Sequence, residues 1–594
     1  MNHQTARQLC IILACAFATQ VKAQLVDESQ IGSTVPLGAI SESLEEQIGA
    51  GRGDISTPLS SIYLIKRDPA RAVRTGRQLF QRKFTFAQGL GPRVNPHSTG
   101  DISSNAAFGA GLIDSCAGCH GRPKGAAGFG GVVPTRPDSR DAPHLFGLGL
   151  QEMLADEITR DLREQRDQAL NAALESGASV AKALVSKGIA YGEITAHGDG
   201  TIDTSQLYGV DSDLRVKPFF AQGGEFSIRN FIIGAFKDEM GLEVFDPDVK
   251  LASLGRVVTT PSGLVLDGTQ ETIKAPPVDS YQHDGDGDGV INEVDPAAVD
   301  FLEFYLLNYF KPGIGKQTAR SDAGLELINQ IGCTSCHVRD LTIETDRRIA
   351  DVETVFDPDK GKFNRLYATG ATRWMMEEDG DPYPKLLPEG KSFVVENIFT
   401  DFKRHDLGET FHERNYDGSL TKQIMTEPLW GVGSTAPYGH DGRSINLEEV
   451  ILRHGGEAQE QRDQFAALSD NEQRMVIEYL QTLILFPPDD TASNLNPGDY
   501  ELNYQDPAGH GTINLGALFQ IDDLSTLPRK ITTQSTGQSL ELKWFGSKGK
   551  HYTLQASHDF VTWETVTSTK SITGGMITFS LPQEGDYRYF RVQH

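Results

Sequence analysis

Two segments of the chain share the pattern Cys-x-x-Cys-His: CAGCH at residues 116–120 and CTSCH at residues 333–337. This spacing suits the covalent attachment of a haem, because each thiol can add to one vinyl group and the adjacent histidine can then bind the iron. The pattern predicts two c-type haems, with the following attachment residues: Cys116, Cys119 and His120 for the first, and Cys333, Cys336 and His337 for the second.

The cysteine count supports this interpretation over two others. The chain has six cysteines, and the four that lie beyond the N-terminal leader are all in the two motifs. Disulfides between residues three positions apart would constrain little chain and would leave both histidines unexplained. A zinc site would have to bring the two cysteine pairs together across more than 200 residues, again without using the histidines.

The N-terminus has the features of an export leader. Arg7 supplies a positive charge, Leu9–Ala18 form a short apolar core, and Val21-Lys22-Ala23 fit a cleavage site before Gln24. A lipoprotein signal ending at Cys15 is the less favoured alternative. No later segment has 18 continuous apolar residues, so we expect no transmembrane helix and a periplasmic or secreted protein.

The chain is acidic, with a net charge of -26 that becomes -28 if Arg7 and Lys22 leave with the leader. Such a surface repels nucleic acid and anionic membranes. It would suit a basic redox partner, although acidic surfaces also serve solubility alone.

Both haem motifs lie between segments with helical patterns. Residues 74–80 precede the first motif, and residues 298–310 close the first unit. Residues 323–331 precede the second motif, and a helix opened by a capping box at residues 469–472 closes the second unit. A helical insertion at 151–190 and an irregular or β segment at 243–297 interrupt the first unit.

The predicted fold class is mainly α, with two cytochrome c-like haem domains, loop-rich insertions and a small C-terminal all-β sandwich. Alternating strands beyond residue 530 predict the sandwich, with Trp544 and Trp563 in its core, and it resembles fibronectin-like domains of secreted bacterial proteins. The predicted boundaries are 1–23 for the leader, 24–320 and 321–490 for the haem domains, 491–525 for a linker, and 526–594 for the sandwich.

The segment DGDGDGVINEVD at 284–295 fits a calcium-binding loop. Acidic residues fall at positions 1, 3, 5 and 12, with a glycine at the sharp turn, a carbonyl from Val290 at position 7 and Asn292 at position 9. The predicted acidic ligands are Asp284, Asp286, Asp288 and Asp295. A polar glycine loop without a metal is the alternative.

The stretch TEPLWGVGSTAPYGHDGRSINLEEVILRHGGEA at 426–458 resembles the second-haem region of bacterial di-haem cytochrome c peroxidases. It is still more similar to their relatives, the di-haem oxidoreductase family, whose members are regarded as peroxidases or thiol oxidoreductases. Supporting stretches are GLGP at 89–92, FGLGLQEML at 146–154, DLRVKPFFAQGGEFSIRNF at 213–231 and TDFKRHDLGE at 400–409. The resemblance covers about residues 70–487.

The resemblance implies a sixth ligand for the second haem in the helix that follows His440. The spacing leads to His454, which would replace the methionine of the peroxidases, and two histidine ligands imply a lower potential than histidine with methionine. Met425 and Met475 are the competing ligands, and a histidine that only caps the helix is the alternative role for His454.

The resemblance also implies that the first haem is the reactive one. Glu239 matches the acid/base of the peroxidases, while Arg229 and Asn230 lie near the position of their glutamine. His144 could be a distal ligand of the first haem or a packed histidine. Further matches are Phe219 and Phe220 near the aromatic residue between the haems, and Thr435 and Pro437 at the carbonyls that bind a calcium.

These observations predict a di-haem oxidoreductase of peroxidase-like type. Its second haem would accept electrons from a small cytochrome or cupredoxin, and its first haem would reduce a substrate such as hydrogen peroxide. Two alternatives remain: a non-enzymatic di-haem electron carrier, and an oxidase acting on a thiol or a protein side chain.

Overall fold

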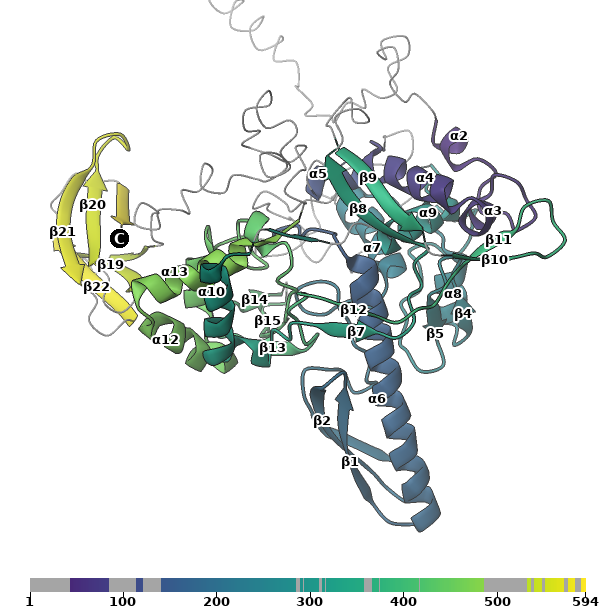
Figure 1. The fold of residues 1–594 in the computed structure, drawn as a ribbon, viewed down its shortest axis with the longest axis horizontal. Coiled ribbons are helices and arrows are strands. Elements are labelled where there is room, and N and C mark those ends of the chain that lie inside the picture. Colours follow the sequence, from purple (N-terminus) through teal and green to yellow (C-terminus); the bar gives the residue numbers. More distant parts are fainter. Residues whose placement is uncertain are drawn as a thin grey trace, which may run out of the picture.

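The computed structural model describes residues 43–84, 114–120, 140–284, 289–291, 293–308, 312–315, 317–356, 366–372, 374–415, 417–485, 531–535, 539–546, 551–570, 575–582 and 589–593. The predicted leader and linker lie outside these residues. Of the described residues, 34% are in helices and 23% in strands, so the fold is mixed and not clearly mainly α (Figure 1). The predicted fold class is confirmed only in part. Among the described residues, no helix is long and apolar enough to cross a membrane.

A pair of crossed helices frames the first haem motif. Helix α4 (Pro69–Gln81), capped by Asp68, packs against α9 (Pro296–Leu307), so both predicted helices are confirmed. A Cβ at Gly76 would lie 2.1 Å from the carbonyl oxygen of Phe301, so only glycine permits this crossing. The other helices of this unit are α2 (Leu44–Ile48), α3 (Ser61–Arg67), α5 (Cys116–Cys119), α7 (Ile228–Met240) and α8 (Pro247–Ser253).

The second motif has the same frame. Helix α10 (Ala319–Gln330) crosses α13 (Asp470–Gln481), and a Cβ at Gly324 would lie 1.9 Å from the carbonyl oxygen of Met475. Ser469 and Glu472 form the predicted capping box of α13. The remaining helices here are η4 (Cys333–Ser335), η5 (Val432–Ser434), α11 (Leu447–Arg453), η6 (Gly456–Ala458) and α12 (Gln459–Ala467).

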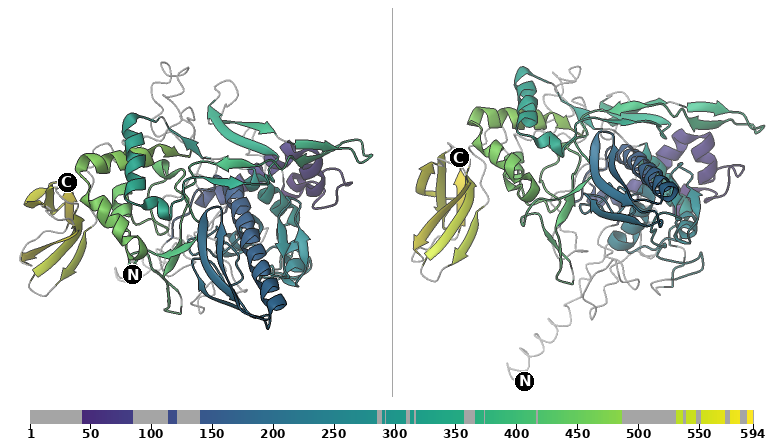
Figure 2. Two further views of the ribbon diagram at one scale, coloured as in Figure 1. Left: turned by 60° about the horizontal axis from the view of Figure 1, so that its bottom comes forward. Right: turned by 90° about the horizontal axis from the view of Figure 1, so that it is seen from below.

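An arm extends from the first unit (Figures 1 and 2). Helix α6 (Leu148–Ser176) packs against the antiparallel sheet β1 (Val180–Ser186), β2 (Ile189–Ala196) and β3 (Ile202–Leu207). The predicted helical insertion at 151–190 is therefore helical only to Ser176. Beyond Gly177 the chain forms strands, because Leu184, Tyr191 and Ile194 are buried against the helix from one face of the sheet.

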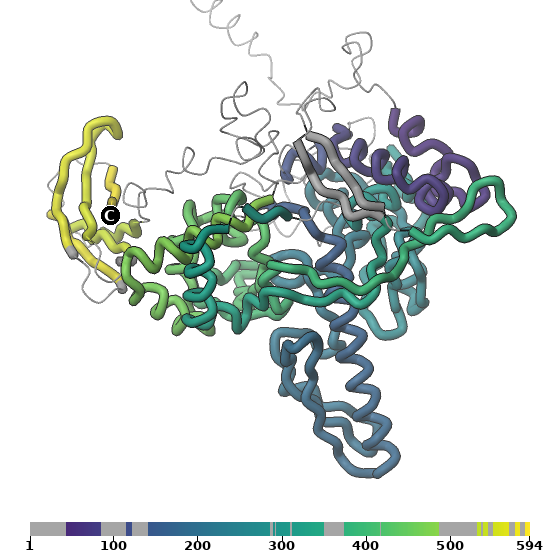
Figure 3. Tube along the Cα trace, viewed as in Figure 1, coloured from purple at the N-terminus to yellow at the C-terminus, as the bar shows by residue number. Residues whose placement is uncertain are grey.

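The chain between α10 and α13 makes a long excursion of short antiparallel strands, which Figure 3 shows reaching toward the first unit and returning. The hairpin formed by β10 (Trp374–Glu377) and β11 (Lys385–Pro388) contacts α3. The other pairs are β7 (Leu341–Ile343) with β12 (Phe393–Val395), β8 (Ala350–Phe356) with β9 (Leu366–Thr372), β13 (Arg404–Asp406) with β16 (Gln423–Met425), and β14 (Glu413–Arg414) with β15 (Leu420–Thr421). Outside the excursion, β4 (Val257–Thr259) pairs with β5 (Val265–Asp267), and β6 (Gly313–Ile314) with β17 (Leu483–Ile484).

The C-terminal residues form two three-stranded antiparallel sheets, as the strand pattern predicts. One contains β18 (Thr532–Ser535), β19 (Ser539–Gly546) and β22 (Gly575–Pro582), and the other contains β20 (His551–Ser557), β21 (Glu564–Lys570) and β23 (Tyr589–Gln593). Trp544 is buried in their core as predicted. Trp563 is not: it is half-buried, with the Arg591 guanidinium 4.2 Å above its ring.

A buried ion cluster joins α7 to α9. The Arg229 guanidinium is fully buried and donates to Asp246 at 2.6 Å and to Glu303 at 2.6 Å, with Asp300 2.9 Å away. Although burial disfavours its charge, these carboxylates hold the pKa of Arg229 well above the ordinary value. Arg229 is thus a structural residue of this cluster.

We expect Arg229→Ala to lower the free energy of unfolding by roughly 3–5 kcal/mol, because it leaves buried carboxylates without their cation. Guanidinium unfolding measures this change. The matched control is Arg160→Ala, which removes an exposed ion pair to Glu344 and should lower the same free energy by less than about 1 kcal/mol. Equal effects from the two substitutions would contradict a stabilising role for the cluster.

Candidate haem sites

The two haem motifs are folded alike. Cys116 and Cys119 lie at the two ends of α5, and Cys333 and Cys336 span the turn η4. All four are free thiols, so no disulfide competes with thioether formation among the described residues. Burial raises the pKa of Cys116 to about 12 and that of Cys333 to about 11, so these thiols are neutral before any haem is attached.

Each motif histidine is held in the tautomer that an iron ligand needs. The Nδ1–H of His120 donates to the Pro143 carbonyl at 2.8 Å, and the Nδ1–H of His337 donates to the Phe399 carbonyl at 3.0 Å. A carbonyl can only accept, so the proton is on Nδ1 and the Nε2 lone pair is left for a metal. Burial lowers the pKa of both rings, which favours the neutral form that binds iron.

His454 meets the same conditions on the second site. It follows α11, and its Nδ1–H donates to the Val450 carbonyl at 2.8 Å. Its pKa is lowered to about 4, mainly by burial and in part by the nearby His337. Two neutral histidines close enough to repel each other's protonated forms therefore face one cavity. His337 and His454 would be the residues that bind the iron of the second haem.

One continuous cavity of about 1090 Å³ connects the two motifs. Pockets for single small molecules usually measure roughly 300–1,000 Å³, so this volume exceeds the usual range for one ligand. Its lining includes both motif histidines, His454 and residues of α7. Thr435 and Pro437, the positions of the implied calcium carbonyls, also line it. The donor atoms, their tautomers and the cavity fit two covalently bound haems.

Helix α7 presents a polar face to the first site. Glu239 lines the cavity and is close enough to Cys119 for its charge to raise the pKa of that thiol. Asn230 lies on the same lining, and its Oδ1 is buried without a hydrogen-bond donor. Asn230 therefore faces the cavity, whereas the neighbouring Arg229 lies in the buried ion cluster.

His144 is near the first site but is already engaged through both ring nitrogens. Its Nε2–H donates to the Trp430 carbonyl at 3.0 Å, and its Nδ1 accepts from the backbone N–H of Phe146 at 3.2 Å. Its pKa is lowered to about 4, mainly by burial. Ligation of iron by His144 remains a prediction, and it would require the bond to Trp430 to break.

Aromatic rings lie beside each of the two sites. Phe231 lies 6.4 Å from the His120 ring, 6.2 Å from Phe219 and 5.2 Å from Phe220, all between ring centroids. On the second side, Phe411 lies 5.3 Å from His454. Phe219, Phe220 and Trp430 all line the cavity, and which aromatic residue lies between the haems stays a prediction.

Sequence reasoning missed several acidic residues of the cavity, which are Asp141, Glu225, Asp238, Glu427 and Glu457. Burial raises the pKa of Glu427 to about 7, against the effect of Arg140, and that of Glu225 by less. Arg140 is itself held by Glu413, to which its Nε–H donates at 2.7 Å. Glu427 falls within the family-like stretch at 426–458, but nothing in that pattern separates it from its neighbours.

Only part of the predicted calcium loop lies among the described residues. Asp284 accepts the backbone N–H of Gly289 at 2.9 Å, and Gly289 has the positive φ of 91° expected at the sharp turn. Asp286, Asp288 and Asn292 lie outside the described residues. Asp295 caps α9 by accepting the N–H of Ala297 at 2.8 Å, a role that the sequence pattern did not indicate. Calcium binding remains a prediction.

Replacing Cys116 and Cys119 together by serine should reduce the haem content from two per chain to one, because serine cannot form the thioethers. A pyridine haemochrome assay against protein concentration measures this ratio. Ser335→Ala, which keeps all four cysteines, is the control and should retain two haems. Two haems in the double variant would contradict attachment at the first motif.

The chain was compared with known families, curated proteins and solved structures. Residues 380–483 match the family model described as "Di-haem oxidoreductase, putative peroxidase", so the family resemblance seen in the sequence is confirmed over that segment. No curated protein matches the chain. Among solved structures, hydrazine synthase from Kuenenia stuttgartiensis aligns over 76% of this chain and 98% of its own, at 13% identity and a TM-score of 0.29. That score is too low to carry an argument.

Proposed function

We propose that this protein is a periplasmic or secreted di-haem oxidoreductase of peroxidase-like type. Electrons from a small redox protein, a cytochrome c or a cupredoxin, pass through the second haem to a reactive first haem. The proposal rests on one observation: both motif histidines line the same cavity as His454 and Glu239. The matched family segment supports the haem-dependent oxidoreductase class.

The two sites differ in a way that suits this division of work. Cys333, Cys336 and His337 would hold the second haem, with His454 as its second axial ligand. Cys116, Cys119 and His120 would hold the first, opposite the polar face of α7. Bound haem supplies one-electron redox chemistry at its iron. A site with two histidines passes electrons, whereas a site with one histidine and a carboxyl group can admit a substrate.

Glu239 would move the protons of the reaction. Reduction of peroxide follows H₂O₂ + 2 e⁻ + 2 H⁺ → 2 H₂O, in which the O–O bond breaks and both oxygens leave as water. A carboxylate beside the bound peroxide can accept its proton and return it to the leaving oxygen. The buried Oδ1 of Asn230 can accept a hydrogen bond from the peroxide O–H and so orient it.

One observation favours a second candidate, a non-enzymatic electron carrier. His120 is close enough to His144 to lower the pKa of His144. His144 is therefore the residue that could act as the sixth ligand of the first haem. A carrier would keep both irons six-coordinate and low-spin in every state.

A hydrogen peroxide titration of the holoprotein, in all-ferric and half-reduced forms, separates these functions. Optical and EPR spectra should show a high-spin ferric first haem that peroxide consumes while the second haem is oxidised in step. Two low-spin haems that do not respond to peroxide in either form would overturn the peroxidase proposal in favour of the carrier. Oxidation of an added thiol without peroxide would instead favour the thiol oxidase.

A further inference from the structure

We propose that a small basic redox protein delivers its electron at the exposed ring of Tyr208, and that the electron reaches the second haem through His405 and the sulfur of Cys336. The direction of transfer rests on the proposed function. The pathway itself rests on the contacts described below.

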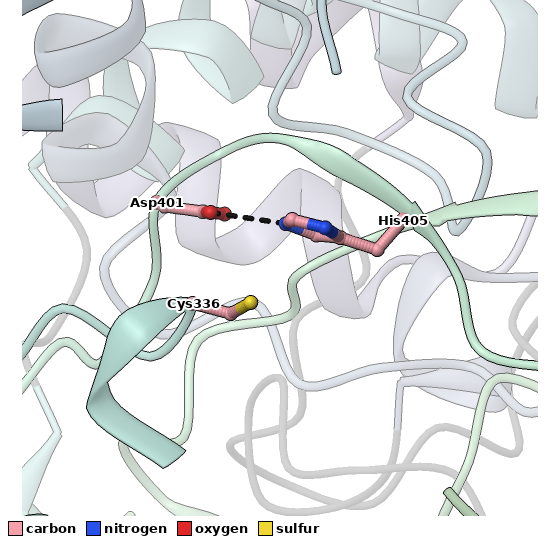
Figure 4. A group of neighbouring side chains, drawn as sticks. All are labelled: Cys336, Asp401 and His405. Carbon is pink, nitrogen blue, oxygen red and sulfur yellow. Dashed lines mark hydrogen bonds and ion pairs between the residues drawn. The ribbon is translucent and has the colours of Figure 1, made fainter. Parts of the chain in front are cut away.

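The inner end of this pathway is a compact group of three side chains (Figure 4). Ligand-type atoms of Cys336, Asp401 and His405 all lie within 4.8 Å of one another. Such a group could suggest a metal ion, but the Cys336 sulfur belongs to the Cys-x-x-Cys-His motif and would be a thioether in the holoprotein. His405, which is 4% exposed, is therefore packed against the covalent edge of the second haem.

The outer end of the pathway reaches the surface. Tyr208 follows β3 directly, and its ring is 39% exposed. Its hydroxyl lies 3.0 Å from the Nδ1 of His405, and the two ring centroids are 5.6 Å apart. An accessible aromatic ring and the edge of the haem are thus separated by one histidine.

Several contacts hold the histidine and the tyrosine in place. The Nε2–H of His405 donates to Asp401 at 3.0 Å, and Glu457 lies 2.9 Å from Nδ1. The backbone N–H of Arg404 donates to the Gly209 carbonyl at 3.1 Å, which fixes the turn carrying Tyr208 against β13. The Lys403 ammonium lies 4.9 Å from the centre of the Tyr208 ring. The pathway is therefore preorganised.

The transfer needs no proton. The donor loses one electron and the second haem iron gains it, while Tyr208 and His405 act only as bridges. Charge indicates the kind of donor: a chain with a net charge of -26 attracts a basic protein at long range and speeds its association. We therefore assign the donor to the class of small basic redox proteins.

Stopped-flow mixing of the all-ferric holoprotein with a reduced basic cytochrome c tests the pathway. Tyr208→Ala should slow reduction of the second haem by at least about tenfold, since it removes both a docking contact and a bridge. Tyr208→Phe keeps the ring but loses the hydroxyl contact, so its rate should lie between those of Tyr208→Ala and the unchanged protein. Raising the salt concentration should slow the unchanged protein.

Two controls make the result specific. Tyr383→Ala removes a side chain that is 61% exposed on the β10–β11 hairpin, and it should leave the rate unchanged. Reduction by dithionite and the optical spectra should be the same in all variants. Reduction of Tyr208→Ala by cytochrome c at the unchanged rate would overturn the pathway, and no reduction of the unchanged protein would overturn the donor class. The peroxide reaction of chemically pre-reduced protein tests the proposed function separately.

Discussion

Replacing Glu239 by glutamine should lower the turnover of hydrogen peroxide by about 10²–10⁴-fold, the usual contribution of a positioned general acid/base. Glutamine keeps the shape of the side chain and its place on the cavity wall, but it cannot accept a proton. Steady-state peroxide consumption with an excess of reduced donor measures the effect. Because both haems should bind as before, the optical spectra of the resting protein should not change.

Glu164→Gln provides the matched control for this substitution. Glu164 is an exposed carboxylate on α6, so its loss should leave peroxide turnover unchanged. Turnover of Glu239→Gln within a factor of about two of the control, far below the contribution of a general acid/base, would exclude Glu239 from proton transfer. Glu427, a cavity carboxyl whose pKa burial raises to about 7, would then be the residue to replace.

Replacing His454 by methionine should raise the reduction potential of the second haem by roughly 0.1–0.3 V, a fraction of the roughly 0.8 V that axial ligands span. The iron should stay low-spin, because a thioether replaces an imidazole as the sixth ligand. Replacing His454 by alanine should instead leave that iron without its ligand and make it high-spin. Spectroelectrochemistry and EPR of the holoprotein measure both effects.

The same variants test whether Met425 or Met475, instead of His454, is the sixth ligand of the second haem. Met425 is buried and lines the cavity, whereas Met475 lies on α13 with its backbone packed against Gly324. A low-spin second haem in His454→Ala, with an unchanged potential, would contradict ligation by His454. Met425→Leu would then be expected to change the spectrum, while it should leave the spectrum alone if His454 is the ligand.

The parts of the molecule that local chemistry dictates were predictable. The haem motifs follow from the reactivity of thiols with vinyl groups, and the four framing helices follow from caps such as Ser469 and from apolar periodicity. The strands of the arm were missed because the helical prediction extends to residue 190, although β-branched residues such as Val180, Val185 and Ile194 favour strands. They become strands because Tyr191 and Ile194 are buried against α6.

Contacts between residues far apart in the chain could not be predicted from the sequence either. Tyr208 and His405 meet only because the turn after β3 is tied to β13, and no spacing rule connects the two positions. The sequence also could not show that the adjacent residues Arg229 and Asn230 face different surroundings. Helix rotation fixed by the buried ion cluster turns Arg229 inward and leaves Asn230 in the cavity.

The glycine at each helix crossing bears on the order in which the chain folds. Helix α4 precedes the first haem motif, whereas its partner α9 follows the arm, α7 and α8. The arm is built from local contacts among α6, β1, β2 and β3, which form quickly, but the crossing at Gly76 has to close a long loop. We therefore expect the arm to fold before α9 packs on α4, so that Cys116 and Cys119 would be easier to reach for haem attachment before the two helices cross.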